Sequence, residues 1–158
     1  MGWWTRRIVG PLKAQLTQGV SPSRLAAALA LGAVVGVLPV LGATTILSAV
    51  GAAALRLNQP ATQVANYLAY PLQLALFIPF FRAGAALLGA EPVGFTIAQL
   101  QAELAADVPG TIVRYLGANL RAVAAWALLA PLAAAAVYLV ARSLLSRLPF
   151  RAAEVAKP

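Results

Sequence analysis

The uncharged stretch LAAALALGAVVGVLPVLGATTILSAVGAAAL occupies residues 25–55, between Arg24 and Arg56. A helix crosses a bilayer with about 20 apolar residues, so this stretch is too long for one straight crossing and too short for two full ones. Pro39 and Gly42 near its middle favour an interrupted helix. We therefore expect a broken or re-entrant membrane helix, whose irregular backbone needs protein or a polar cavity around it.

The composition of the whole chain also indicates a membrane protein. Of its 158 residues 61% are hydrophobic and 10% are charged, with a mean hydropathy of +0.82, whereas soluble domains carry about 25% charged residues. The sequence contains no cysteine and no histidine, which excludes disulfides, thiol nucleophiles, imidazole bases and the usual transition-metal ligands. Glu103 and Asp107, four residues apart, are interpreted as a solvated helix face. We expect no catalytic residue, no metal site, no cofactor and no enzymatic activity.

The net charge of +8 raises the question of an acidic partner. The basic residues are scattered at the ends of apolar runs and do not gather on one helix or loop, so membrane lipids with anionic headgroups are the expected partner, and nucleic acid is not. Most basic residues lie before residue 25 and after residue 141. Because basic residues favour the cytoplasmic side, both termini should be cytoplasmic and the protein should cross the membrane more than once.

The pattern predicts an all-α fold: a small polytopic helical membrane protein with Pro-broken or re-entrant helices and amphipathic surface helices. Five segments are expected along the chain: a cytoplasmic amphipathic lead-in (1–20), a membrane core with broken helices (21–90), an extracytoplasmic amphipathic segment (91–121), a transmembrane helix (122–145) and a basic cytoplasmic tail (146–158).

Within the core, Ser21-Pro22 is typical of a helix start, and this helix should reach Val37 or Leu38. A second helix should cover residues 44–55, so that the pair either dips into the membrane and returns or makes two short crossings. A kinked crossing is expected over residues 61–81, because Pro71 and Pro79 interrupt it.

The segment from Thr96 to Asn119 has apolar residues at helical spacing on both sides of Pro109-Gly110. We expect two short surface helices separated at that pair. The uncharged residues 122–141 form the strongest conventional transmembrane signal, with Pro131 as a site of bending.

Polar residues within the apolar runs are the candidate binding residues. The turn at Pro39 is either a tight corner or the wall of a polar pocket, and Arg82 either extends to outer headgroups or holds an anionic substrate or lipid phosphate. Asn66, Tyr70 and Gln73 share one helix face, which suits interhelical hydrogen bonds or substrate contact. The full set of substrate- or lipid-binding candidates is Pro39, Gly42, Thr44, Thr45, Asn66, Tyr70, Gln73 and Arg82.

Ala28, Gly32 and Gly36 recur every fourth residue and form a small-residue face. Such a face allows close helix packing, and a lipid or substrate groove is the alternative.

Glycines and prolines at fixed offsets also carry a resemblance. Gly19-Val20-Ser21-Pro22, followed by Gly32, Gly36, Pro39, Gly42 and Thr45 and then by Leu55-Arg56-Leu57-Asn58, resembles the bacterial membrane family named domain of unknown function 2062. The likeness covers about residues 19–89. It implies a small protein of the bacterial inner membrane and implies no activity. Tyr70-Pro71 stands where that family commonly has Asn-Pro.

Two classes of function remain open at this point. The first is a small oligomeric transport or lipid-handling protein with a polar site at the broken helices. The second is a non-catalytic interaction or assembly subunit that docks partner helices through its small-residue face. A homo-oligomer or a place in a membrane complex is expected in either case.

Overall fold

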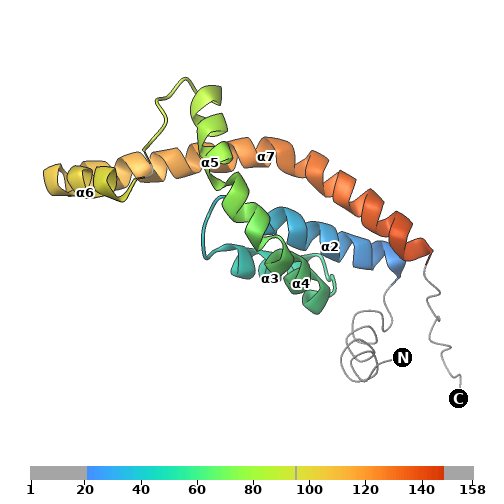
Figure 1. Ribbon diagram of the computed structural model, residues 1–158. Coiled ribbons are helices and arrows are strands. Elements are labelled where there is room, and N and C mark those ends of the chain that lie inside the picture. The colour runs from blue at the N-terminus through green and yellow to red at the C-terminus, as the bar shows by residue number, and fades with distance from the viewer. Residues whose placement is uncertain (1–20, 95, 148–158) are drawn as a thin grey trace, which may run out of the picture.

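The computed structural model describes residues 21–94 and 96–147. Within these ranges the chain forms helices and turns without a strand, so the prediction of an all-α fold is confirmed. The predicted lead-in over residues 1–20 and the end of the predicted basic tail lie outside the described residues. The helices are α2 (Pro22–Gly36), α3 (Thr44–Ala54), α4 (Gln59–Leu68), α5 (Tyr70–Leu87), α6 (Ile97–Ala106) and α7 (Val108–Ser146) (Figure 1).

Helices α2 and α3 form a hairpin whose turn covers residues 37–43. Ser21 caps α2 by accepting a hydrogen bond from the Arg24 N–H, and Pro22 fits the first turn because its missing N–H has no partner to lose there. Gly42 adopts φ +83°, in the left-handed region that favours glycine. The break therefore lies where Pro39 and Gly42 indicate it.

The end of α3 is a Schellman turn with an arginine in the position that usually holds glycine. The Leu57 N–H donates to the Ala52 carbonyl (2.8 Å) and the Arg56 N–H to the Ala53 carbonyl (3.1 Å). Arg56 has φ +51°, and it is the one non-glycine residue with positive φ among residues 21–94 and 96–147. Its backbone is consequently strained, because a Cβ crowds the neighbouring carbonyl in this conformation.

Helix α4 runs in the same direction as α2 and packs closely against it. A Cβ added to Gly32 would overlap the Thr62 carbonyl oxygen, and one added to Gly36 would lie 2.7 Å from the Ala69 Cβ. Asn58 caps α4 by accepting from the Ala61 N–H at 2.9 Å. The two backbones therefore approach each other more closely than any side chain larger than hydrogen would allow.

The crossing predicted over residues 61–81 is two helices in the structure. Helix α4 ends at Leu68, and α5 begins at Tyr70 with Pro71 in its first turn. A proline at this point cannot donate to the preceding turn, so the chain starts a new helix and changes direction (Figure 1). Pro79 lies inside α5, which continues to Leu87.

The expected pair of short surface helices is correct only in its first half. Helix α6 ends at Ala106, but the part after Pro109 belongs to α7, which runs for 39 residues, about 58 Å, without interruption through Arg121. Asp107 caps α7 by accepting from the Gly110 N–H (3.1 Å), which places Pro109 in the first turn of the helix. The prediction of a separate helix before residue 122 is wrong for this reason.

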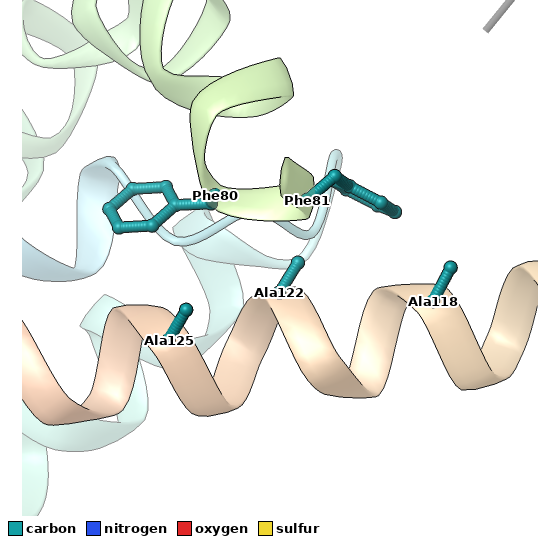
Figure 2. Packing of buried hydrophobic residues seen from close by; sticks show 5 residues of the cluster. All are labelled: Phe80, Phe81, Ala118, Ala122 and Ala125. Carbon is teal, nitrogen blue, oxygen red and sulfur yellow. The ribbon is translucent and has the colours of Figure 1, made fainter. Parts of the chain in front are cut away.

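Helix α7 is held against α5 by a small apolar cluster, shown in Figure 2. Phe80 and Phe81 of α5 pack over the alanine face of α7 formed by Ala118, Ala122 and Ala125. Gly84 lies beside this cluster, where an added Cβ would overlap the Arg121 carbonyl oxygen. Small residues thus determine the distance between α5 and α7 as they do between α2 and α4.

Two of the described helices, α5 and α7, are long and apolar enough to cross a membrane by length and composition. In the most apolar part of α7 only 6% of the residues are buried. Leucines such as Leu128, Leu132 and Leu139 are more than half exposed. These features suggest that the protein lies in a membrane.

The charged side chains separate along the molecule. The start of α2 and the end of α7 lie together (Figure 1). This basic end of the described chain carries no carboxylate, and its arginines are Arg24, Arg56, Arg142 and Arg147. All the described carboxylates lie in the other half, together with the remaining described arginines: Glu91, Glu103, Asp107, Arg82, Arg114 and Arg121.

The close approach of α2 and α4 predicts that Gly32→Ala destabilises the protein by about 2 kcal/mol, because the added methyl forces the two backbones apart. Gly51→Ala is the matched control, since its Cβ would meet only the end of the Leu31 side chain, at 3.3 Å. Unfolding in mixed micelles, followed by circular dichroism as sodium dodecyl sulfate increases, measures both variants. Equal stability of the two would contradict the described packing.

The strained backbone at Arg56 predicts that Arg56→Gly stabilises the protein, whereas Gly32→Ala destabilises it. This substitution should raise the free energy of unfolding by about 1 kcal/mol, because glycine adopts the left-handed conformation without a steric cost. The same unfolding titration measures the change. A loss of stability would mean that the Arg56 side chain stabilises the fold more than its backbone strain destabilises it.

Candidate functional site

The turn after α2 exposes backbone carbonyls that no helix can satisfy, and side chains from distant helices bind them. Gln73 of α5 donates from Nε2 to the Leu38 carbonyl at 2.7 Å, and Asn119 of α7 donates from Nδ2 to the Pro39 carbonyl at 2.8 Å. Trp126 of α7 donates from Nε1 to the Val34 carbonyl at 3.1 Å. Val34 lies in the last turn of α2, where carbonyls lack intrahelical partners, and Leu38 and Pro39 lie in the turn that follows, so these three side chains form a polar cap over the end of α2 and its turn.

This polar cap is buried at Gln73 and Pro39, whereas Asn119 and Trp126 are half-buried. Gln73 is 1% exposed, and Pro39 is among the most completely buried residues of the described chain. The sequence predicted Gln73 as a member of a polar helix face. It did not predict that Asn119 and Trp126 would bind this turn. The polar atoms at Pro39 therefore bind the backbone of the same chain and do not line a water-filled space.

The structure disperses the other predicted binding residues. Thr44 is buried, and its carbonyl accepts from the Ser48 Oγ at 2.6 Å. The Thr45 carbonyl accepts from Gln63 Nε2 of α4 at 3.2 Å. Asn66 is 3% exposed and lies against Gly36. The remaining predicted residues, Gly42, Tyr70 and Arg82, are exposed.

The small-residue face of α2 is already occupied. Ala28, Gly32 and Gly36 are buried, and their neighbours lie on α4 or directly after it: Ala61, Thr62, Ala65, Asn66 and Ala69. A partner helix could reach this face only after α4 had left it.

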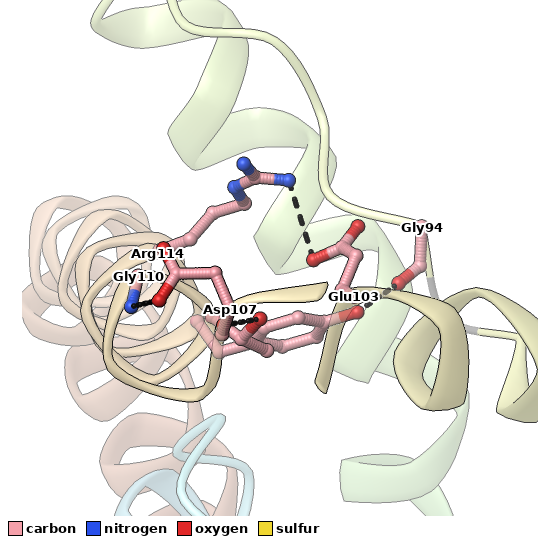
Figure 3. Close-up of polar contacts among 7 residues, drawn as sticks. Gly94, Glu103, Asp107, Gly110 and Arg114 are labelled. Atoms are coloured by element: carbon pink, nitrogen blue, oxygen red, sulfur yellow. Dashed lines mark hydrogen bonds and ion pairs between the residues drawn. The ribbon is translucent and has the colours of Figure 1, made fainter. Parts of the chain in front are cut away.

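The acidic residues near the start of α7 have structural partners, which Figure 3 shows. Glu103 forms an ion pair with Arg114 at 3.3 Å, and Asp107 caps α7 through Gly110. The Tyr115 hydroxyl donates to the Gly94 carbonyl at 2.9 Å, which ties the loop after α5 to α7. These contacts position α6 and the loop beside α7.

An apolar groove of about 970 Å³ lies between α2, α4, α5 and α7. Its only side-chain N–H, that of Trp126, already donates to the Val34 carbonyl. The lining side chains are Leu29, Ala33, Val34, Val37, Ala65, Leu68, Ala69, Leu72, Leu76, Pro79, Phe80, Trp126, Leu129, Ala130, Ala133, Ala136, Val137, Val140, Ala141, Leu144 and Leu145.

The groove exists because α7 approaches α2 at two separate places. Trp126 reaches the end of α2 at Val34, and Leu145 packs beside Leu25 and Ala28 near its start. Between these contacts α7 lines the groove with alanines such as Ala133 and with larger apolar side chains such as Leu129 and Val137. The volume is at the upper end of the range of about 300–1,000 Å³ that is usual for small-molecule sites.

Comparison with known protein families gives one match. The model of a family described as an uncharacterized protein conserved in bacteria (DUF2062) covers residues 6–153. The chain belongs to this family. No curated protein and no solved structure matches the chain.

Membership of DUF2062 confirms the resemblance and extends it over almost the whole chain, beyond the predicted residues 19–89. The match therefore includes α7 and the groove as well as the broken helices. The spacing of alanines along α7 (Ala130, Ala133, Ala136) was the available sequence signal for the groove, because small residues on one face leave space beside a helix.

The cap on α2 predicts a specific loss of stability. Gln73→Leu removes the side-chain donor to the buried Leu38 carbonyl, which keeps the Val40 N–H at 2.7 Å, and should destabilise the protein by about 1 kcal/mol. The exposed Gln101→Leu on α6 is the matched control and should change stability by less than about 0.5 kcal/mol. Detergent unfolding measures both. If the two variants unfold alike, the hydrogen bond from Gln73 does not stabilise the fold.

Proposed function

We propose that this member of DUF2062 is a multi-pass protein of the bacterial inner membrane that binds a phospholipid acyl chain in its apolar groove. It handles lipid by binding, without catalysis. The groove is the observation that carries this proposal: about 970 Å³ of space lined by apolar side chains from four helices.

The exposure of apolar side chains supports the membrane environment. Helix α2 is about 22 Å long and α3 about 16 Å, each shorter than a hydrocarbon core of about 30 Å. This length supports a re-entrant hairpin over two true crossings.

The basic end, with its four arginines and no described carboxylate, supports a cytoplasmic position of both termini.

The dimensions of the groove support a lipid as its occupant. The lining residues of α7 from Trp126 to Leu145 extend over about 28 Å, close to the thickness of the hydrocarbon core. An apolar groove of this length, open along its side in a bilayer, is in contact with acyl chains at all times. Filling it restores the van der Waals contacts that its lining lacks.

The predicted polar transport site and the predicted docking face receive less support. Polar side chains at Pro39 bind backbone carbonyls, and α4 covers the face of Gly32 and Gly36. Assembly into a homo-oligomer or with a partner subunit stays a prediction.

A substitution within the groove tests the proposed function. Ala133→Trp fills the groove with an indole and should abolish most labelling of the groove-lining residues of α7 by a phospholipid that carries a diazirine on its acyl chain. The protein is reconstituted into liposomes, irradiated and digested, and the labelled peptides are identified by mass spectrometry.

Ala135→Trp is the matched control, because Ala135 is exposed on the same helix and does not line the groove. It should leave labelling of the groove-facing residues unchanged. Equal labelling of wild type and Ala133→Trp at those residues would refute the lipid groove.

A further inference from the structure

Two arginines meet at the basic end, and no carboxylate of the described residues pairs with either of them. Arg24 donates from Nη2 to the Arg56 carbonyl at 2.6 Å and to the Leu55 carbonyl at 3.4 Å. These bonds fix the guanidinium of Arg24 at the end of α3 and leave its other N–H groups free to bind a further acceptor. Both arginine side chains are exposed, and the ion pair of the described chain, Arg114 with Glu103, lies in the other half of the molecule.

The conformation of Arg56 points to a ligand. Its φ of +51° is strained for any residue with a Cβ, and glycine is the residue that best suits this position of a Schellman turn. The Arg56 guanidinium forms no hydrogen bond or ion pair within residues 21–94 and 96–147 that compensates for this strain. Strained residues of this kind concentrate at binding sites.

The arginine pair lies at one end of the groove. Leu29 and Leu145 line the groove, and both pack against the cluster of Leu25, Ala28 and Ala61. Leu57, the residue after Arg56, packs against the same cluster, and Arg24 directly precedes Leu25. An acyl chain in the groove therefore brings its headgroup toward Arg24 and Arg56.

We infer that Arg24 and Arg56 form a binding site for the phosphate of an anionic phospholipid whose acyl chain occupies the groove, an inference that rests on the proposed function. A guanidinium presents its N–H donors in a planar fork that matches phosphate oxygens, and such charge-assisted bonds are strong at a partly desolvated surface. The bound Arg24 supplies a fixed donor, and Arg56 supplies a second cation on the adjacent backbone. The pair selects lipids by net negative charge.

The test compares lipids with the same acyl chains and different headgroups. The full chain, purified in detergent, is mixed with equal amounts of dioleoylphosphatidylglycerol and dioleoylphosphatidylcholine, and native mass spectrometry counts each bound lipid. The wild type should prefer phosphatidylglycerol. Arg56→Gly should lower this preference about tenfold, as expected for a lost charge-assisted hydrogen bond, while raising the midpoint of detergent unfolding.

Arg142→Gln is the charge control. It removes one exposed arginine from the same end of the molecule, at a residue that does not line the groove, and should leave the preference unchanged. An equal loss in Arg56→Gly and Arg142→Gln would overturn the inference, because it would indicate diffuse attraction by net charge.

Two further arms separate the remaining outcomes. Soluble glycerol 3-phosphate, added in excess, should not displace phosphatidylglycerol, and efficient displacement would overturn the inference in favour of a site for soluble phosphate esters. Ala133→Trp should lower the total bound lipid of both kinds. If it does so while Arg56→Gly keeps the wild-type preference, the arginine site is wrong and the groove stands. If Ala133→Trp binds as much lipid as the wild type, the proposed function itself fails.

Discussion

The fold depends on how the chain satisfies the backbone carbonyls released where α2 ends. An unpaired carbonyl in apolar surroundings costs several kcal/mol, and the turn at Pro39 releases more than one. Gln73, Asn119 and Trp126 bind these carbonyls from positions 35, 80 and 92 residues further along the chain. The same bonds fix α5 and α7 relative to α2, so the position of the groove follows from the need to cap one helix.

Small residues determine the remaining distances. Gly32 and Gly36 bring α4 onto α2, and Gly84 brings α5 onto α7, in each case with backbone against backbone. Between Trp126 and Leu145, α7 borders the groove, and its small lining residues are Ala130, Ala133, Ala136 and Ala141. Residues without large side chains therefore contribute both to the two close helix contacts and to the groove.

Local signals in the sequence predicted the features that depend on local chemistry. Ser21-Pro22 and Asn58-Gln59-Pro60 each combine a capping side chain with a proline in the first turn, and both start helices. Asp107-Val108-Pro109 has the same pattern and starts α7, yet it was interpreted as a break between surface helices. The hydrogen bonds from α7 to the end of α2 and the groove could not be predicted, because they depend on how distant helices pack.

The exposure of α7 connects the groove with the surrounding membrane. The leucines on its outer face are exposed over most of its length, and its inner face borders the groove. In water, exposure of both faces would cost free energy in proportion to their apolar area, about 25 cal/mol per Å². In a bilayer, acyl chains contact both faces. The acyl chain proposed for the groove differs from the others only in the protein groups that lie at its headgroup end. At the basic end those groups are Arg24 and Arg56, and an anion bound there, as we propose, would compensate for the backbone strain at Arg56. On this proposal, the exposed helix α7 holds a lipid between itself and α2.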